Sequence, residues 1–577
     1  MIEGDDGEAI APGASLPLII GVTAHRNLLG DEVEGARALA RDFLLRLRGE
    51  FPQLSLTVLS ALAAGGDQLV AEEALALGIR LVAPLPLPRE VYARDFTDAV
   101  SRARFDALCS RALVLEPAQA DDATPAWVRE GEPSHDWQYA QSGIYLASHC
   151  HVLLALWDGK PSALPGGTAQ VVDYYLGGRK PALVERRRGE DAASCLDNDD
   201  LRLAFHIVCS RADANGDGAP APPLRPLEVC WRTGAGILPG EQPMPARFRA
   251  TFLRMAEFGA DVARHAGRIR AATVPHPGKD APSPIERAFA AADTLALHYQ
   301  HRVLAAMRAM YTLAALMGIA FVLYDGLAQD YMIFLFLVLF ASGVTLDVVA
   351  RRRDWHRKYL DYRALAEGLR VQGYWHRAGL SMTGDAEFAH DNFLQKQDVD
   401  LGWIRDVMRA VALEAAAMPR SQDDLAALIA EWVGESGRSG QLHYYERRLA
   451  ERTRRHALTH AVGAVSLWLG IAISVFLALA VFRLPRGAQN VLVAIMAVLS
   501  IVAAVREAYA YRKADKELIK QYRFMRRLFA NARCALDRCG DPAGQRRILR
   551  ALGEAALAEH AEWALMHRER PLERARL

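Results

Sequence analysis

Hydrophobic residues follow two different patterns along this chain, and the first pattern fills residues 16–235. Short apolar runs such as PLIIGVT and HVLLALW are separated there by longer amphipathic stretches. Continuous apolar runs of this length are typical of strands buried on both faces, and amphipathic stretches between them are typical of helices. The pattern predicts an α/β domain with a Rossmann-like, doubly wound parallel sheet.

The apolar runs locate the expected strands of this sheet. They lie at Pro17–Thr23, 54–63, 79–88, Ala112–Leu115, His151–Gly159, 179–187 and Leu227–Arg232. The helix after the first strand is expected at Asp31–Arg48, with the Asp31 side chain as its N-cap. Gly-rich turns are expected to open two more helices, in AGGDQLVAEEALALG and in PGGTAQVVDYYLGG.

Four long apolar runs make up the second pattern. They are Met310–Leu327, Tyr331–Ala350, Ala461–Phe482 and Ala488–Val505. Each run approaches the roughly 20 residues that cross a bilayer as a helix. Turns of three and five residues join the runs in pairs, which predicts two antiparallel hairpins. We therefore expect an all-α four-transmembrane bundle with long cytoplasmic helices.

Basic residues lie on one side of this expected bundle. Arginine and lysine flank the outer ends of both pairs of runs, whereas the two turns contain only Arg483 and Arg486. By the positive-inside rule, both chain termini and the central segment are cytoplasmic in a multi-pass protein of the inner membrane. Asp347 lies one helical turn before Arg351 and is expected to pair with it.

An internal repeat connects the two pairs of runs. LHYQHRVLA at 297–305 and LHYYERRLA at 442–450 share six of nine positions, and each precedes one pair. A basic, aromatic helical pattern follows each pair. Repeated membrane units are typical of pseudo-two-fold bundles. We expect two copies of one two-span unit, packed together through their aromatic residues.

These patterns divide the chain into segments. We expect a disordered N-terminus at 1–15, the α/β domain at 16–235, a helix and linker at 236–284, the first two-span unit at 285–380, a cytoplasmic helical connector at 381–440 and the second two-span unit at 441–577. The first segment is acidic and polar, which is not the pattern of a signal peptide.

Composition narrows the class of function. The formal net charge is +1, so no basic field indicates nucleic acid as a partner. The seven cysteines contain no CxxC pair, which favours a reducing compartment over a disulfide scaffold. The sequence His149-Cys150-His151 has no further ligand cluster beside it, so we interpret it as packing and expect no metal site.

Candidate ligand-binding residues fall where the expected strands end, because ligands of doubly wound sheets bind at the carboxyl ends of the strands. Glycine allows backbone N–H groups to approach a phosphate, and a helix N-terminus favours the negative charge. Two Gly-Gly turns that open helices therefore predict a phosphate-bearing ligand. Asp67 has an alternative role as the cap of its own helix. The candidates are Gly21, Thr23, His25, Arg26, Gly65, Gly66, Asp67, Asp158, Gly166, Gly167, Thr168 and Asp173.

Three stretches resemble the SLOG superfamily, Rossmann-like domains that include the LOG phosphoribohydrolases, DprA and the ligand-binding region of TRPM channels. The stretches are GVTAHR, SALAAGGDQLVAEEAL and ALWDGKPSALPGGTAQVVDYYL, and they cover about 150 residues. The resemblance implies a nucleotide or ADP-ribose-like ligand and no further cofactor. Enzymatic members carry PGGxGTxxE, whereas this chain has PGGTAQVVD, with Asp173 rather than a glutamate. The departure leaves the catalytic residues unassigned and favours a binding domain over an enzyme.

The two-span units resemble the SLATT family, bacterial two-span effector domains of nucleotide-signalling systems. This resemblance rests on the paired spans and the basic, aromatic helices beside them. Together the two resemblances imply a homo-oligomeric membrane effector in anti-phage or other conflict defence. In such an effector, ligand binding makes the bundle permeabilise the inner membrane or open a pore. The alternative is a membrane-anchored N-glycoside hydrolase that acts on a nucleotide or an NAD derivative.

Overall fold

The computed structural model describes most of the chain. The described residues are 16–115, 133–162, 164–177, 202–212, 218–240, 243–273, 281–326, 329–380, 393, 401–418, 424–480, 482–512 and 515–568. The chain forms two compact units: an α/β unit (Met1–Thr294, Ala364–Gln422 and Leu557–Met566) and a helical unit (Leu295–Arg363, Asp423–Ala556 and His567–Leu577). The disorder predicted at 1–15 and the strand predicted at 179–187 lie outside the described residues.

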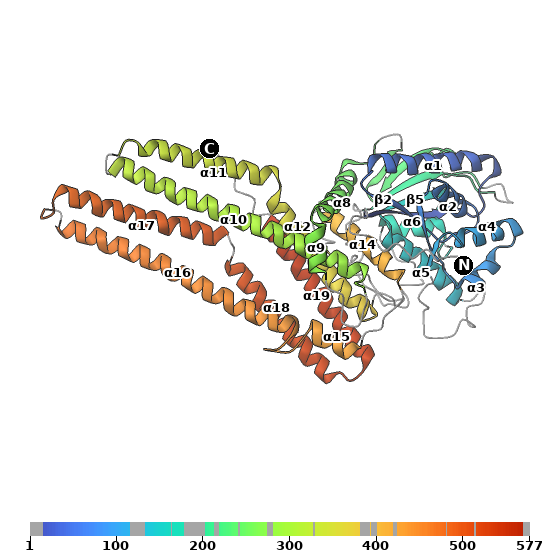
Figure 1. Ribbon diagram of the computed structural model, residues 1–577. Coiled ribbons are helices and arrows are strands. Elements are labelled where there is room, and N and C mark those ends of the chain that lie inside the picture. The colour runs from blue at the N-terminus through green and yellow to red at the C-terminus, as the bar shows by residue number, and fades with distance from the viewer. Residues whose placement is uncertain are drawn as a thin grey trace, which may run out of the picture. The chain divides into compact units, whose positions relative to one another are not determined.

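The α/β unit is built on an eight-stranded sheet with the order β4-β3-β2-β1-β5-β6-β7-β8. Neighbouring strands from β4 to β6 are parallel, whereas β7 and β8 pair in antiparallel fashion. This confirms the α/β class and the mostly parallel sheet (Figure 1). The strands are β1 (Pro17–Ala24), β2 (Ser55–Ser60), β3 (Arg80–Pro84), β4 (Leu113–Leu115), β5 (Val152–Trp157), β6 (Leu203–Val208), β7 (Val229–Thr233) and β8 (Gly236–Pro239).

The sheet beyond β5 differs from the prediction. β6 lies where we predict no strand, although its residues LAFHIV are apolar except for His206. The His206 ring is nevertheless fully buried, since one ring nitrogen accepts a hydrogen bond from Arg232 Nε (3.0 Å) and the other donates to Trp157 O (2.8 Å). β7 is antiparallel to β6, and the described residues between these strands form no helix that could carry a parallel crossover.

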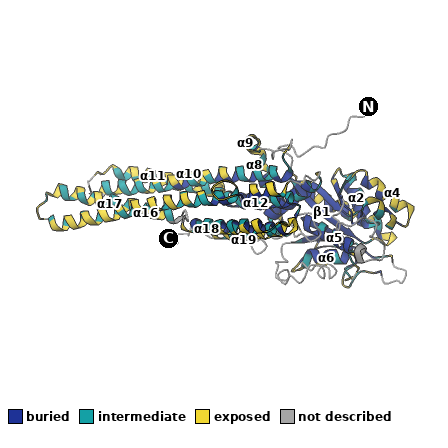
Figure 2. Ribbon diagram, turned by 90° about the horizontal axis from the view of Figure 1, so that it is seen from below, coloured by how far each residue is buried: buried dark blue, intermediate teal, exposed yellow. Residues whose placement is uncertain are grey.

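Helices cover both faces of the sheet. α5 and α6 pack on one face in a buried core that includes Ile19, Leu153 and Ala204. Phe205 follows Ala204 and therefore points to the opposite face, where it stacks on Phe43 of α1 with ring centroids 4.3 Å apart. Figure 2 shows β1 as buried along its length. The helical elements up to residue 272 are η1 (Gly30–Glu32), α1 (Val33–Glu50), α2 (Gly66–Ala76), α3 (Arg89–Tyr92), η2 (Ala93–Asp95), α4 (Ala99–Cys109), α5 (Pro133–His149), α6 (Thr168–Gly177), α8 (Ala246–Arg264) and α9 (Ala266–Ala272).

The predicted cap of the first helix is wrong. Asp31 lies inside the short 3-10 turn η1, and α1 begins at Val33 without a side-chain cap. The neighbouring Glu32 turns inward instead, where its carboxylate accepts a hydrogen bond from the backbone N–H of Ser210 (2.7 Å). This tertiary contact sets the start of the helix.

One helix from the predicted connector packs into the α/β unit. α14 (Gly402–Ala416) contributes Ala410 and Leu413 to the core beneath α5. His151 links α14 to β1, because its Nδ1 accepts a hydrogen bond from Ile19 N (3.0 Å) and its Nε2 donates one to Asp406 O (2.9 Å). Burial lowers the pKa of His151 to about 4, so the ring is neutral, as this pair of hydrogen bonds requires.

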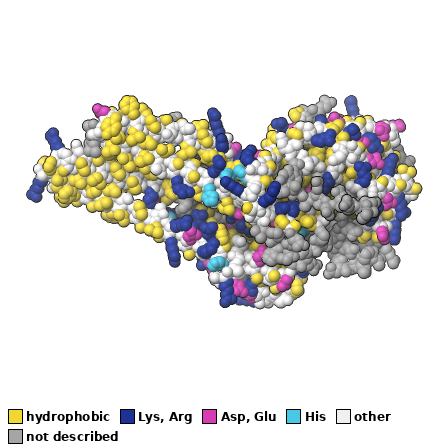
Figure 3. Space-filling view, viewed as in Figure 1, with side chains coloured by type: hydrophobic (Ala, Val, Ile, Leu, Met, Phe, Trp, Pro, Cys, Tyr) yellow, Lys and Arg dark blue, Asp and Glu magenta, His cyan; other side chains and the backbone are white. Residues whose placement is uncertain are grey.

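Among the described residues, four helices are long and apolar enough to cross a membrane: α10, α11, α16 and α17. Hydrophobic side chains cover much of their surface (Figure 3). The amphipathic stretch before each first run is continuous with that run, so α10 and α16 are single long helices. Asp347 pairs with Arg351 at 2.8 Å, as predicted. The remaining helices are α10 (Pro284–Gly326), α11 (Met332–Arg352), α12 (Trp355–Arg377), α15 (Leu425–Trp432), α16 (Gly440–Ala480), α17 (Arg486–Arg512), α18 (Asp515–Arg538) and α19 (Pro542–Arg568).

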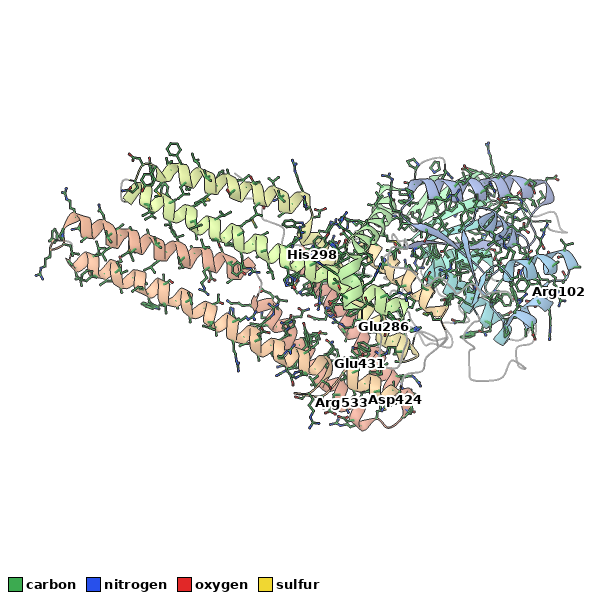
Figure 4. All side chains as sticks on the ribbon, in the orientation of Figure 1. Arg102, Glu286, His298, Asp424, Glu431 and Arg533 are labelled. Carbon is green, nitrogen blue, oxygen red and sulfur yellow. The ribbon has the colours of Figure 1, made fainter. Side chains whose placement is uncertain are left out.

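Equivalent positions of the repeat make equivalent contacts. Gln300 and Tyr445 occupy the same place in the two motifs. Gln300 Nε2 donates to the Tyr359 hydroxyl on α12 (3.1 Å), and the Tyr445 ring contacts Tyr522 on α18 at 5.9 Å. The motif of each copy thus packs on the long helix that follows its own hairpin. Figure 4 shows His298 of the first motif on α10.

Candidate functional site

The candidate site lies where the order of the strands reverses. β1 pairs with β2 on one side and with β5 on the other, all in parallel. The loops after β1 and β5 therefore leave the same edge of the sheet in opposite directions, which opens a crevice at this point in doubly wound folds. His25 and Arg26 follow β1, and Asp158 follows β5. The structure thus brings together predicted residues from two distant parts of the sequence.

A polar network around the buried carboxylate of Asp158 closes the β5 side of this edge. Asp158 is 1% exposed, and its carboxylate lies 3.2 Å from His25 Nε2 and 2.8 Å from Arg211 Nε. Its oxygen Oδ1 also accepts a hydrogen bond from Lys160 N (3.0 Å), and its own N–H donates to His25 Nε2 (3.0 Å). The loops after β1, β5 and β6 are therefore tied together before any ligand binds.

His25 is a neutral acceptor in this network. Burial lowers the pKa of His25 below its ordinary value, against the opposing influence of Asp158. Arg211, which completes the network, is absent from the sequence prediction. It follows β6 directly, so the missed strand explains the missed residue.

The first Gly-Gly turn lies against the end of β1. Gly65 has a φ of +83°, and a Cβ there would lie 2.0 Å from the carbonyl oxygen of Arg26. The Gly66 N–H donates to His25 O (3.1 Å), and a Cβ at Gly66 would lie 2.5 Å from that of Ala24. These glycines allow the start of α2 to approach backbone of the protein itself, and the Gly66 N–H is already used.

Asp67 is the most perturbed acid at this edge. Its side chain is buried, and Oδ1 has no hydrogen-bond partner among the described residues. Burial raises the pKa of Asp67 to about 7, while backbone N–H groups of Ala63 and Ala24 and the charge of Arg26 act against the rise. α2 has no side-chain cap, so the alternative role of Asp67 as a cap is not realised. A carboxyl group poised near neutral pH can donate or accept a hydrogen bond.

Arg26 lies on the β2 side of the same edge. Its guanidinium carbon is 5.7 Å from the centroid of the Tyr139 ring, which is within cation–π range. The Tyr139 hydroxyl donates to the carboxylate of Asp95. Arg26 remains exposed. Tyr139 and Asp95 come from α5 and η2 and are absent from the prediction, because no local motif marks either residue.

The second Gly-Gly turn folds against α5. Gly166 has a φ of +67°, and a Cβ there would lie 2.6 Å from the backbone of Tyr139. Its N–H donates to Gln170 Oε1 (2.6 Å), and the Gly167 N–H donates to Leu164 O (3.0 Å). The two N–H groups that the sequence offers to a phosphate therefore have internal partners in this structure.

Four predicted residues lie in or beside these elements. Gly21 is inside β1, where a Cβ would lie 2.8 Å from that of Cys150, so it serves the packing of α5 on the strand. Thr23 is buried near the end of β1, Thr168 is buried at the start of α6, and Asp173 is exposed on α6. The side chains that converge at the edge are thus His25, Arg26, Asp67 and Asp158.

Comparison with known proteins gives no family for this chain. No protein-family model matches it, and no curated protein matches it. Among the described residues, no group of three or more His, Cys, Asp and Glu side chains is arranged to hold a metal ion. The described residues form an α/β unit with a mostly parallel sheet and a helical region with four long apolar helices.

Proposed function

We propose that this protein is a bacterial inner-membrane effector whose α/β unit binds a nucleotide-type ligand and thereby opens or permeabilises the membrane. The observation that carries the proposal is the polar edge at the β1–β5 strand reversal, in a chain whose described residues also form four long apolar helices. The first feature is typical of a ligand site, and the second is typical of a membrane-spanning bundle.

Two arginines that reach the surface at this edge support an anionic ligand, and one of them already pairs with Asp158. Arg26 is exposed, and the Arg211 side chain is 39% exposed although it pairs with Asp158. Two guanidinium groups beside a neutral histidine can bind phosphate oxygens, which arginine recognises with paired N–H groups.

The helical unit supports the membrane part of the proposal. In α11, α16 and α17, none of the most apolar 18-residue window is buried within the protein. Such surfaces are stable in lipid and unfavourable in water. The positive-inside rule places both termini in the cytoplasm. The anti-phage role, and assembly into a homo-oligomer, follow only from the resemblance to SLOG and SLATT domains.

α14 provides a route from ligand binding in the α/β unit to the opening of the membrane by the apolar helices. It lies in the chain between the two pairs of apolar helices, and it is bound to the start of β5 through His151. Asp158 follows the end of the same strand. A ligand that binds more tightly to one arrangement of β5 and α14 would shift the bundle between states.

Dye release from liposomes tests this function. The full-length protein is reconstituted and exposed to a panel of nucleotides and ADP-ribose, and we expect leakage with at least one of them. Arg26→Gln should abolish the response without preventing insertion. Arg48→Gln is the matched control, because Arg48 is an exposed arginine in the last turn of α1, at the opposite edge of the sheet.

The same experiment separates the competing functions. If no ligand in the panel causes leakage, or if all of them cause it equally, the result contradicts a ligand-gated effector. Release of free base during incubation would instead support the N-glycoside hydrolase. Extraction of the protein from membranes by alkaline carbonate would exclude the membrane-spanning bundle.

A further inference from the structure

Three contacts show which residues of the four apolar helices lie at the same depth along the helical unit. The Tyr311 hydroxyl of α10 donates to Ala508 O of α17 (3.2 Å). A Cβ at Gly343 of α11 would lie 4.0 Å from Leu313 of α10. A Cβ at Gly463 of α16 would meet the Arg506 guanidinium of α17. Leu313, Gly343, Gly463 and Arg506 therefore lie at similar depth along the helices.

Arginines from all four helices lie between this level and about 14 Å from it, on the side away from the hairpin turns. Arg352 of α11 and Arg454 of α16 each lie nine residues beyond it on the side away from the hairpin turns, or about 14 Å along a helix. Arg308 of α10 lies five residues beyond it. We name this set the basic belt: Arg308, Arg352, Arg353, Arg454 and Arg506.

The carboxylates nearby neutralise other arginines. Asp347 pairs with Arg351, and Glu451 pairs with Arg448 and Arg455. Within the part of the chain that the structure describes, no carboxylate lies within ion-pair distance of a belt residue, and all of them except Arg506 are exposed. The belt thus presents cationic groups directly below an exposed apolar surface.

Arg506 is held in a specific position within this belt. Its guanidinium lies across the backbone of α16 at Gly463, where the missing side chain makes room for it. Its Nε has no hydrogen-bond partner among the described residues. The charge of Arg506 thus adds to that of the exposed belt residues beside the apolar surface.

We infer that the basic belt binds the phosphate groups of anionic phospholipids in the cytoplasmic leaflet. The inference rests on the membrane-spanning part of the proposed function and goes beyond it, because insertion alone requires no particular headgroup. Arginine forms paired hydrogen bonds with phosphate oxygens. Clustered cations beside membrane helices attract anionic lipids with about 1 kcal/mol per residue, which is about fivefold in affinity.

Lipid titration of the detergent-solubilised full-length protein tests the inference. The melting temperature is measured with phosphatidylglycerol, with phosphatidylcholine and with inorganic phosphate as separate additions. We expect phosphatidylglycerol alone to stabilise the protein, with an apparent affinity that falls as salt is raised. Arg352→Gln together with Arg353→Gln should weaken phosphatidylglycerol binding about 25-fold, at roughly fivefold per arginine.

A matched control uses arginines at the other ends of the apolar helices. Arg483 and Arg486 are exposed beside the hairpin turn between α16 and α17, and replacing both with Gln should leave phosphatidylglycerol binding unchanged. Arg506→Gln should weaken binding by at least fivefold and keep the melting temperature of the lipid-free protein.

Equal stabilisation by phosphatidylcholine, or an equal loss in the control variant, would overturn the inference. Stabilisation by inorganic phosphate would assign the belt to a soluble anion. If the protein gives one of these results and still resists carbonate extraction, the inference on lipid binding is refuted and the proposed membrane-spanning function is not.

Discussion

Val100 of α4 and Val338 of α11 are exposed to almost the same extent, at 63% and 62%, but their surroundings differ completely. Val100 is an isolated apolar side chain on a helix whose other face is packed against the α/β unit. Val338 belongs to a helix with no buried residue, and Leu335, Leu337 and Phe340 are exposed around it. Scattered exposed valines are normal in water, whereas a continuous apolar surface requires another apolar medium.

The two units therefore obtain their stability in different ways. In the α/β unit, Ile19, Ile20 and Val22 of β1 are fully buried, and the buried polar residues His151 and Asp158 have specific hydrogen-bond partners. Changes there act through burial and unpaired charge. In the helical unit, a substitution on the apolar surface acts by changing how favourably the helix is transferred from water into lipid.

The largest effect is expected from the buried carboxyl of Asp67. Its pKa is raised from 3.8 to about 7, so the folded state binds a proton more tightly than the unfolded state. Stability therefore falls as pH rises through this window, by at most about 4 kcal/mol. Asp67→Asn should remove this slope. Chemical denaturation between pH 4 and pH 8 measures it, and a wild-type curve that is flat over this range would contradict the assignment.

Removal of Asp158 should cost about 3 kcal/mol of unfolding free energy. The substitution Asp158→Ala removes the acceptor of the Lys160 N–H and the partner of Arg211, and hydrogen bonds to a charged group contribute up to about 3 kcal/mol. Asp42→Ala is the control, because Asp42 is 64% exposed in its pair with Arg46 and should contribute less than about 0.5 kcal/mol. Equal losses of unfolding free energy in the two variants would show that burial of the carboxylate does not determine its contribution to stability.

The two exposed valines give the most direct test of the comparison. Val338→Arg should disfavour insertion of α11 by about 3 kcal/mol, because a charged residue near the centre of a spanning helix must leave water. Val100→Arg should change stability by less than about 0.5 kcal/mol. The fraction that resists carbonate extraction reports the first effect, and denaturation reports the second. If Val338→Arg inserts as well as the wild type, α11 does not lie in lipid.

The smallest effect is expected at Gly463. The Cβ of Gly463→Ala would meet only the guanidinium of Arg506, which can move, so the loss in melting stability should stay below about 1 kcal/mol. Gly65→Ala is the contrasting change, because its Cβ would meet the backbone of Arg26 at a positive φ. It should cost more than about 1 kcal/mol. Thermal melting compares the two, and the reverse order would contradict the close approach at Gly65.

The candidate site was only partly predictable from the sequence. His25, Arg26, Asp67 and Asp158 follow from the rule that ligands meet strand ends. The two Gly-Gly turns also lie at this edge, but their N–H groups bond to His25, Gln170 and Leu164. A sequence motif indicates that a glycine is needed and does not indicate whether a ligand or the protein's own backbone fills the space. Arg211 and Tyr139 needed the tertiary structure, since neither belongs to a motif.

The sequence by itself determined the α/β class, the parallel strands β1 to β5 and the four apolar helices, because hydrophobic periodicity and run length are local properties of the chain. Tertiary structure alone decided that His206 is buried in a sheet strand, that Asp31 is not a cap and that α14 joins the core under α5. Each depends on a partner far away in sequence: Arg232 for His206, Ser210 for Glu32 beside Asp31, and His151 for α14. Long-range hydrogen bonds that compensate buried polar groups leave no periodic trace in the sequence.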